Sequence, residues 1–202
     1  PRRLKDYNYS RAGAYFITIC VKNRKCLFGD IENETMILNS AGKIACDCMI
    51  DVPLHYGNVE LGEFIIMPNH VHAVIMIHDD LQGRRKASQP LEENIGGTQA
   101  SHLHQEMNNI RQHNKLSVIV GSYKSSVTKN INLVKGNKDF AWQRYFHDHI
   151  IRNTKGLENI SDYIRRNPVK WQEDLENEKY LAELSAKERD KKRAEFYKTL
   201  MY

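Results

Sequence analysis

The pattern of apolar and polar residues along the chain alternates between segments typical of strands and segments typical of helices. Residues 14–21 (AYFITICV) are β-branched, aromatic and apolar at successive positions, which indicates a central strand. Residues 116–134 instead repeat apolar side chains every three or four positions, as one face of a helix does. The same criteria predict strands at 14–21, 59–66, 71–78 and 142–151, and helices at 39–52, 116–134 and 157–167.

The order of these elements indicates the fold. A strand, a helix, two strands, a helix and a strand in succession form the βαββαβ pattern of ferredoxin-like domains. The short connection at residues 67–69 predicts a hairpin between the second and third strands, with Pro68 confined to the turn. We therefore expect an α+β sandwich: a ferredoxin-like domain with an antiparallel sheet, helices on one face, and additional C-terminal helices.

Two regions fall outside this pattern. Residues 79–114 contain Gly83, Gly96 and Gly97 among many polar and charged residues, which predicts an insertion or mobile loop. Residues 171–202 are highly charged and helix-prone, which favours an exposed helical tail that packs on the core through a few apolar residues or mediates a dimer. The expected organisation is one domain over 1–170, interrupted by 79–114, followed by a tail over 171–202.

Composition narrows the class of protein. A length of 202 residues suits one compact domain with appendages, and the net charge of +5 permits a polyanionic partner. No apolar run approaches the roughly 20 residues that a membrane helix needs, and the basic start has no apolar segment typical of a secretory signal. The 4 cysteines lack the paired CxxC spacing of zinc sites. We expect a cytoplasmic protein without a membrane partner.

The strongest local signal for chemistry is the run from Pro68 to His72 (PNHVH). Side chains on a strand alternate between its faces, so His70 and His72 point the same way. Two imidazoles on one strand face form half of a site for a divalent ion, and a phosphate can supply further ligands to Mg²⁺ or Mn²⁺. The alternative is a pair of strand histidines that only pack.

A second signal lies in the helix expected at 157–167. Tyr163 and Asn167 are four residues apart, so they share a helix face and can offer a phenol and an amide oxygen to one site. Arg165 and Arg166 flank them and are suited to holding phosphates. A half-buried structural tyrosine is the alternative for Tyr163, and Tyr123 is its most serious rival as a reactive phenol.

Three motifs, in this order, resemble those of HUH single-tyrosine transposases of the insertion-sequence and REP-associated tyrosine transposase type. Residues 67–72 (MPNHVH) resemble the HUH motif, which is a histidine, a bulky hydrophobic residue and a histidine. Residues 142–153 (WQRYFHDHIIRN) look like the fourth-strand signature of the family. The run from Asp162 to Ile164, followed by Asn167 and Pro168, is similar to the nucleophile helix of the REP-associated branch.

The resemblance implies specific roles. His70 and His72 would be metal ligands, Asn167 a third ligand through its amide, and Tyr163 the nucleophile. The implied function is metal-dependent nicking and joining of single-stranded DNA through a 5′-phosphotyrosine intermediate, by a transposase acting on hairpin-forming DNA with Mg²⁺ or Mn²⁺. Insertion-sequence relatives form homodimers that exchange the nucleophile helix, whereas the REP-associated branch keeps it in its own subunit, and the sequence is compatible with both.

The grip on DNA is expected from basic segments. Near the N-terminus, cations that meet phosphates are interleaved with tyrosines that stack on bases, which is typical of single-strand binding. A basic arm without a DNA role is the alternative. The candidate DNA-binding residues are Arg2, Arg3, Lys5, Arg11, Lys124, Lys129, Arg165 and Arg166.

Two other functions stay open at this point. One is a catalytically silent protein, derived from a transposase, that binds structured nucleic acid. The other is a metal nuclease in which water attacks and Tyr163 is structural. A covalent protein–DNA adduct indicates the transposase, free 5′-phosphate ends indicate the nuclease, and neither product indicates the binding protein.

Overall fold

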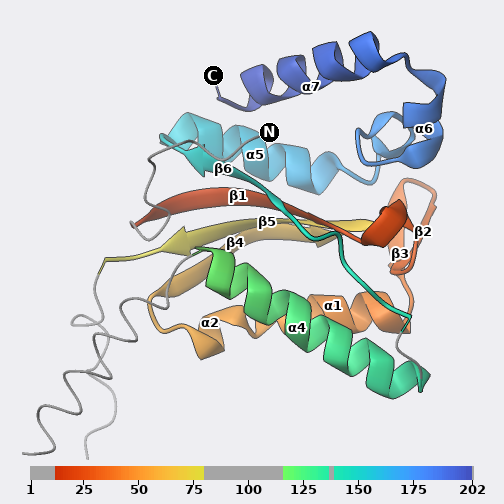
Figure 1. Ribbon diagram of the computed structural model, residues 1–202. Helices are drawn as coiled ribbons and strands as arrows, with labels where there is room; N and C mark the ends of the chain where they lie inside the picture. Colours follow the sequence, from red (N-terminus) through yellow and green to blue (C-terminus); the bar gives the residue numbers. More distant parts are fainter. Residues whose placement is uncertain (1–11, 80–115, 137–138, 202) are drawn as a thin grey trace, which may run out of the picture.

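The computed structural model describes residues 12–79, 116–136 and 139–201 (Figure 1). The expected insertion therefore lies outside the described residues, except for Asp79. So do four of the candidate DNA-binding residues, Arg2, Arg3, Lys5 and Arg11.

Four strands form the central sheet: β1 (Gly13–Cys20), β4 (Val59–Ile66), β5 (His70–Ile77) and β6 (His147–Ile151). Their order is β4-β5-β1-β6, and every neighbouring pair is antiparallel. The strands β1 and β5 lie in the middle, which explains why both are apolar at almost every position. This arrangement confirms the expected ferredoxin-like fold.

The helices form layers on both faces of the sheet (Figure 1). The core helices α1 (Ser40–Ile50) and α4 (Leu116–Lys135) cover one face together with the short α2 (Val52–His55), as the βαββαβ pattern predicts. The additional helices α5 (Thr154–Arg166) and α7 (Ala186–Met201) lie on the opposite face. Between them come the short 3₁₀ helix η2 (Trp171–Glu173) and α6 (Glu178–Glu183). The described helices are all too short or too polar to span a bilayer.

The alternation along the two central strands divides the core in two. On the α1 and α4 side, Tyr15 and Ile17 of β1 pack in a large cluster of buried apolar residues. On the other side, Phe16 and Val74 pack against α5, which inserts Ile160 and Ile164. The antiparallel register pairs Phe16 with Val74, Thr18 with His72, and Cys20 with His70, so both histidines face the α5 side.

Three features differ from the prediction. The short strands β2 (Gly29–Glu32) and β3 (Thr35–Leu38) form a separate hairpin that the apolar pattern does not reveal, because their side chains are largely exposed. The 3₁₀ turn η1 (Lys22–Arg24) follows β1. The last strand, β6, begins at His147 rather than at residue 142. Trp142 makes only an isolated bridge to Val21, and its ring packs against the core.

Candidate active site

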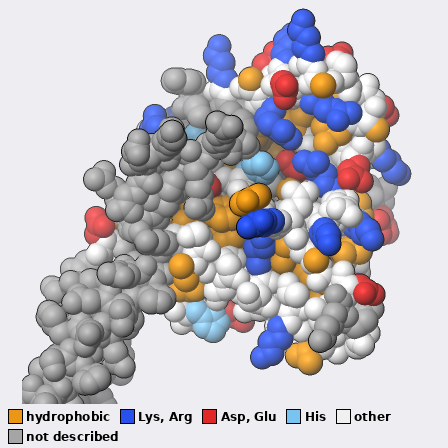
Figure 2. All heavy atoms as spheres, in the orientation of Figure 1, with side chains coloured by type: hydrophobic (Ala, Val, Ile, Leu, Met, Phe, Trp, Pro, Cys, Tyr) orange, Lys and Arg blue, Asp and Glu red, His pale blue; other side chains and the backbone are white. Residues whose placement is uncertain are grey.

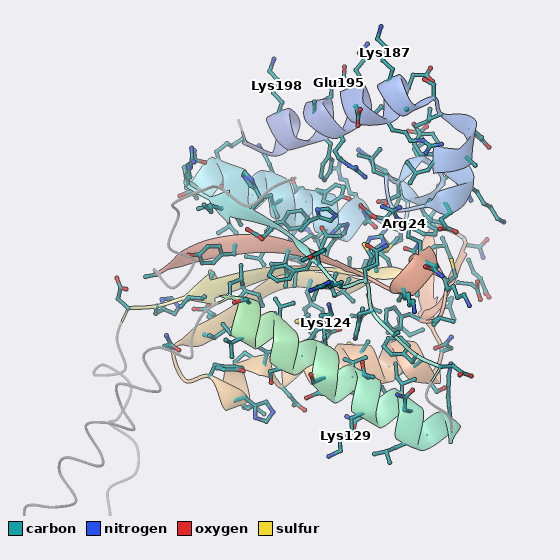
Figure 3. All side chains as sticks on the ribbon, in the orientation of Figure 1. Arg24, Lys124, Lys129, Lys187, Glu195 and Lys198 are labelled. Atoms are coloured by element: carbon teal, nitrogen blue, oxygen red, sulfur yellow. The ribbon has the colours of Figure 1, made fainter. Side chains whose placement is uncertain are left out.

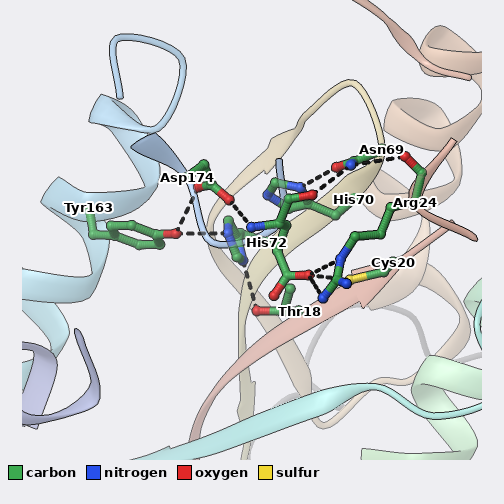
Figure 4. Close-up of polar contacts among 9 residues, drawn as sticks. Thr18, Cys20, Arg24, Asn69, His70, His72, Tyr163 and Asp174 are labelled. Atoms are coloured by element: carbon green, nitrogen blue, oxygen red, sulfur yellow. Dashed lines mark hydrogen bonds and ion pairs between the residues drawn. The ribbon is translucent and has the colours of Figure 1, made fainter. Parts of the chain in front are cut away.

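The two histidines of β5 form the floor of the candidate site. Both are buried, and their ring centroids are 4.4 Å apart. Nδ1 of His72 lies 2.9 Å from Oγ1 of Thr18 on the neighbouring strand, and Nδ1 of His70 lies 2.8 Å from Oδ1 of Asn69. Each ring thus uses Nδ1 for a neighbour, which leaves both Nε2 atoms available for other partners (Figure 4).

Asn69 fixes the protonation pattern of His70. Its Nδ2 donates to the backbone carbonyls of Arg24, at 3.1 Å, and of Glu176, at 2.8 Å. The amide orientation is therefore set, and its Oδ1 accepts from Nδ1–H of His70. Nε2 of His70 then carries a lone pair, and it is buried with no hydrogen-bond partner among the described residues.

Helix α5 carries Tyr163 toward these rings. Oδ1 of Asn153 accepts from the backbone N–H of Gly156 and caps the start of the helix. Ile160 and Ile164, four residues apart, are buried against the sheet and fix the rotation of the helix. The Tyr163 hydroxyl then lies 3.1 Å from Nε2 of His72 and 3.4 Å from Oδ2 of Asp174 (Figure 4).

Asn167 and Asp174 complete the polar wall. Nδ2 of Asn167 donates to Oδ2 of Asp174 at 2.8 Å, and the backbone N–H of Glu176 donates to Oδ1 of Asp174 at 2.6 Å. Oδ1 of Asn167 is buried and, like Nε2 of His70, has no hydrogen-bond partner among the described residues. Sequence reasoning singled out Asn167 but missed Asp174, because nothing in a charged, helix-prone tail distinguishes one carboxylate from its neighbours.

The donor set fits a divalent cation. One ligand atom from each of His70, His72 and Asp174 lies within 4.8 Å of the other two. Oδ1 of Asn167 adds an amide oxygen to this set, and burial makes both this oxygen and Nε2 of His70 costly to leave unsatisfied. Imidazole, carboxylate and amide oxygen are together suited to Mn²⁺ or Mg²⁺.

The sequence of this chain is similar to those of two known proteins. No family model matches the chain. A Haemophilus influenzae protein of uncharacterised function is 39% identical over 173 residues, which is 85% of this chain and 89% of that protein. A protein of the same organism, assigned as a REP-associated tyrosine transposase, is 30% identical over 166 residues, or 81% of this chain and 74% of that protein. The chain belongs to the REP-associated tyrosine transposase family.

A solved structure has a fold similar to that of this chain. The structure of a REP-associated tyrosine transposase bound to a REP hairpin covers 84% of this chain and 74% of that chain, with a TM-score of 0.51 and 20% sequence identity. This likeness shows that the two chains share a fold. The resemblance that the three sequence motifs indicate is thus confirmed at the level of the family.

Burial sets the charge state of the candidate metal ligands and of Tyr163 in this family member. It lowers the pKa of His70 to about 4 and the pKa of His72 well below 6.5, and the proximity of His70 lowers the latter further. Both rings are neutral near pH 7, which is the form that binds metals. Burial, and next the negative charge of Asp174, raise the pKa of Tyr163 well above 10. The phenol is therefore protonated in the metal-free protein.

Residues 171–176, which follow α5, cover the candidate site. Oε2 of Glu176 accepts from Nη2 of Arg24 at 2.8 Å and from Sγ of Cys20 at 3.3 Å. The Trp171 ring lies 6.1 Å from His70 between centroids. The expectation of an exposed tail is wrong for this segment, because Asp174 and Glu176 are buried. Charged residues are buried here because each has a hydrogen-bonded partner.

The other predicted residues lie in different surroundings. The Tyr123 hydroxyl is buried and donates to the carbonyl of Ala45 on the opposite face of the sheet, which excludes Tyr123 from the site. Nζ of Lys124 donates to the carbonyls of Gln143 and Arg144, so it has a structural role.

Lys129 projects from α4 away from the sheet, on the face opposite the site (Figure 3). Arg165 is paired with Glu63 and Asp162 at the surface, whereas its neighbour Arg166 lines a cavity beside Tyr163.

Proposed function

We propose that this protein cuts and rejoins single-stranded DNA through a covalent bond to Tyr163. The observation that carries the proposal is the 3.1 Å contact between the Tyr163 hydroxyl and Nε2 of His72, because it joins the candidate nucleophile to the candidate metal ligands. The substrate is hairpin-forming DNA, a proposal supported by the family relative whose structure contains a REP hairpin.

His70, His72 and Asp174 would hold Mn²⁺ or Mg²⁺, with Asn167 as a further ligand through Oδ1. A cation bound there would polarise a phosphodiester oxygen and stabilise the charge that develops on it. Asn69 holds the ring of His70 in the tautomer that such binding requires. Asn167 has a second task, because its amide N–H fixes the carboxylate of Asp174.

The covalent step exchanges one phosphoester for another. The bond from Oη of Tyr163 to phosphorus forms, the bond from phosphorus to the 3′ oxygen breaks, and the downstream strand stays linked by a 5′-phosphotyrosine. The phenol loses its proton and the departing 3′ oxygen gains one, so a free 3′-hydroxyl is released. Oδ2 of Asp174 accepts a hydrogen bond from the phenol and is placed to receive its proton first. Attack by a 3′-hydroxyl on the phosphotyrosine reverses the step, and no ATP is consumed.

The site is proposed to act within one subunit. Tyr163 and the two histidines belong to the same chain and are already in contact, which supports catalysis without exchange of the nucleophile helix. A homodimer is therefore not required for the chemistry. We expect that mixing a Tyr163→Phe variant with a His72→Ala variant does not restore activity, as it would if subunits shared their sites.

The experiment that tests the proposal is trapping of the covalent adduct. A 3′-labelled single-stranded hairpin oligonucleotide is incubated with the protein and Mn²⁺ or Mg²⁺, and the products are separated under denaturing conditions. We expect a labelled protein band with the wild type and with Tyr123→Phe, and none with Tyr163→Phe, which should still bind the oligonucleotide.

Each of the other results would overturn the proposal. An adduct formed by Tyr163→Phe would show that another residue is the nucleophile. Free 5′-phosphate ends without an adduct would indicate a hydrolytic metal nuclease. Binding without either product would indicate a silent protein that binds structured nucleic acid.

A further inference from the structure

A cavity of about 430 Å³ lies beside Tyr163, on the side of the sheet covered by α5 and α7. Its floor contains Thr18 and His72, and Tyr163 forms part of its wall. The covalent chemistry proposed above uses the Tyr163 hydroxyl and the metal ligands but leaves this space unexplained. Its volume falls within the roughly 300–1,000 Å³ of pockets that hold small organic ligands.

The rest of the wall combines an aromatic ring with cations. Phe196 of α7 lies against Tyr163, with ring centroids 4.8 Å apart and planes 65° apart. Arg166 comes from the end of α5, Lys170 from the turn after it, and Arg193 from α7. Four carboxylates also line the cavity, those of Asp162, Glu173, Asp174 and Glu176. Asp162 is paired with Arg165 and Glu176 with Arg24, and the carboxylate of Asp174 is directed at the candidate metal ligands. An aromatic face with nearby cations is the usual equipment for holding one base and its phosphate.

The helix α7 directs two of these side chains toward the cavity. Arg193 and Phe196 are three residues apart, so they share one face of the helix. Lys187 and Lys198 of the same helix project away from α5 (Figure 3). On the face seen in Figure 2, Lys and Arg side chains are also most frequent over the upper half, where α5 and α7 lie. Of these cations on α7, Arg193 is the one that lines the cavity.

We propose that this cavity, the flanking-nucleotide pocket, receives the nucleotide next to the phosphate that Tyr163 attacks. Its base stacks on Phe196, and its phosphate lies toward Arg193 and Arg166. The inference deepens the proposed function and rests on it, because a phosphate in reach of the Tyr163 hydroxyl has its neighbouring nucleotide at this cavity. The C-terminal helix is then part of the substrate site.

The first test measures whether one base and one ring act as a pair. Adduct formation is followed with hairpin oligonucleotides that carry an abasic residue at each position around the cut, using the wild type and Phe196→Ala. Loss of a stacked base should reduce kcat/KM roughly ten- to hundred-fold at one position next to the cut. Phe196→Ala should show a similar loss with the intact oligonucleotide and no additional loss with that abasic one.

Controls separate this coupling from damage to the fold. Phe196→Trp keeps an aromatic face and should retain most of the activity and the sensitivity to the abasic position. Arg193→Ala should raise KM for the oligonucleotide and make binding less dependent on salt, whereas Lys187→Ala, on the outer side of the same helix, should change neither. Binding is also measured in a Tyr163→Phe background, so the pocket is tested even if no adduct forms and the proposed function fails.

Three results would overturn the pocket. Losses from Phe196→Ala and from the missing base that multiply at every position would show that the two do not touch. Equal KM and equal salt dependence of binding in Arg193→Ala and Lys187→Ala would show that Arg193 does not contact a phosphate. A rise in activity in Phe196→Ala or Arg193→Ala would show that α7 covers the cavity instead of binding the strand within it.

Discussion

Replacing Asn69 by alanine tests whether a single amide orients the candidate metal ligands. In the wild type, Oδ1 of Asn69 accepts from Nδ1–H of His70 at 2.8 Å and keeps the proton away from Nε2. Without this acceptor the proton is free to move to Nε2, which is buried near the amide of Asn167. A ring protonated at Nε2 has no lone pair there for a metal. We expect Asn69→Ala to weaken Mn²⁺ binding about 10- to 100-fold.

The same substitution also has a cost in stability that follows from the contacts. It removes three hydrogen bonds: the buried ones to His70 and to the carbonyl of Glu176, and the partly buried one to the carbonyl of Arg24. At about 1 kcal/mol each, the free energy of unfolding should fall by about 3 kcal/mol in the presence of a chelator. Urea denaturation measures this change, and calorimetric titration with Mn²⁺ measures the affinity of the folded variant.

Asn69→Asp separates the two effects. It keeps an acceptor for His70 and loses the donor to the two carbonyls, so its stability should fall while its affinity for Mn²⁺ stays near that of the wild type. The reasoning would be refuted if Asn69→Ala bound Mn²⁺ as tightly as the wild type. It would also be refuted if Asn69→Asp lost as much affinity as Asn69→Ala, because the acceptor would then be irrelevant.

Three further predictions concern stability and are measured by urea denaturation. Arg24→Met should lose about 3 kcal/mol, since Glu176 stays buried without its cation, and adding Glu176→Gln should recover part of the loss in a double-mutant cycle. With a chelator present, lowering the pH from 6.5 to 4 should reduce the free energy of unfolding of the wild type by roughly 3 kcal/mol more than that of His70→Gln. The reason is that the His70 imidazole binds a proton in the unfolded chain over this range but, with its pKa of about 4, stays largely neutral in the folded protein. Gly42→Ala should lose about 1–3 kcal/mol, since its Cβ would lie 2.1 Å from a backbone oxygen. Gly121→Ala, with no atom within 4 Å, should not destabilise α4.

The sequence predicts those parts of the structure that a short period encodes. Nearly continuous runs of β-branched and other apolar residues at 14–21 and 71–78 identify the two central strands. The alternation of side-chain direction along a strand places His70 and His72 on one face of the sheet. The spacing of four brings Tyr163 and Asn167 to one side of α5. Both patterns are local, so they survive without knowledge of the neighbours.

The rest depends on how the chain folds back, which no local period encodes. Asp174 and Glu176 lie in a segment whose charges are typical of a solvated helix, yet both are buried. Glu176 finds its partners Cys20 and Arg24 only because the chain folds back onto β1 and the turn after it, and Asp174 accepts from the amide of Asn167. Adjacent arginines show the same limit: Arg165 pairs at the surface and Arg166 lines the cavity. Tyr123 finds its partner on α1, 78 positions away in the chain, and Lys124 finds its partner in the segment before β6, 19 positions away.

The bonds that enclose the site join distant parts of the chain, and this has a consequence for biosynthesis. Glu176 lies 156 positions after Cys20 and 107 after Asn69. Such long-range contacts form late in folding. On a ribosome, both imidazoles emerge about a hundred residues before the segment that will cover them, so the path for an incoming ion is widest while the polypeptide is still growing.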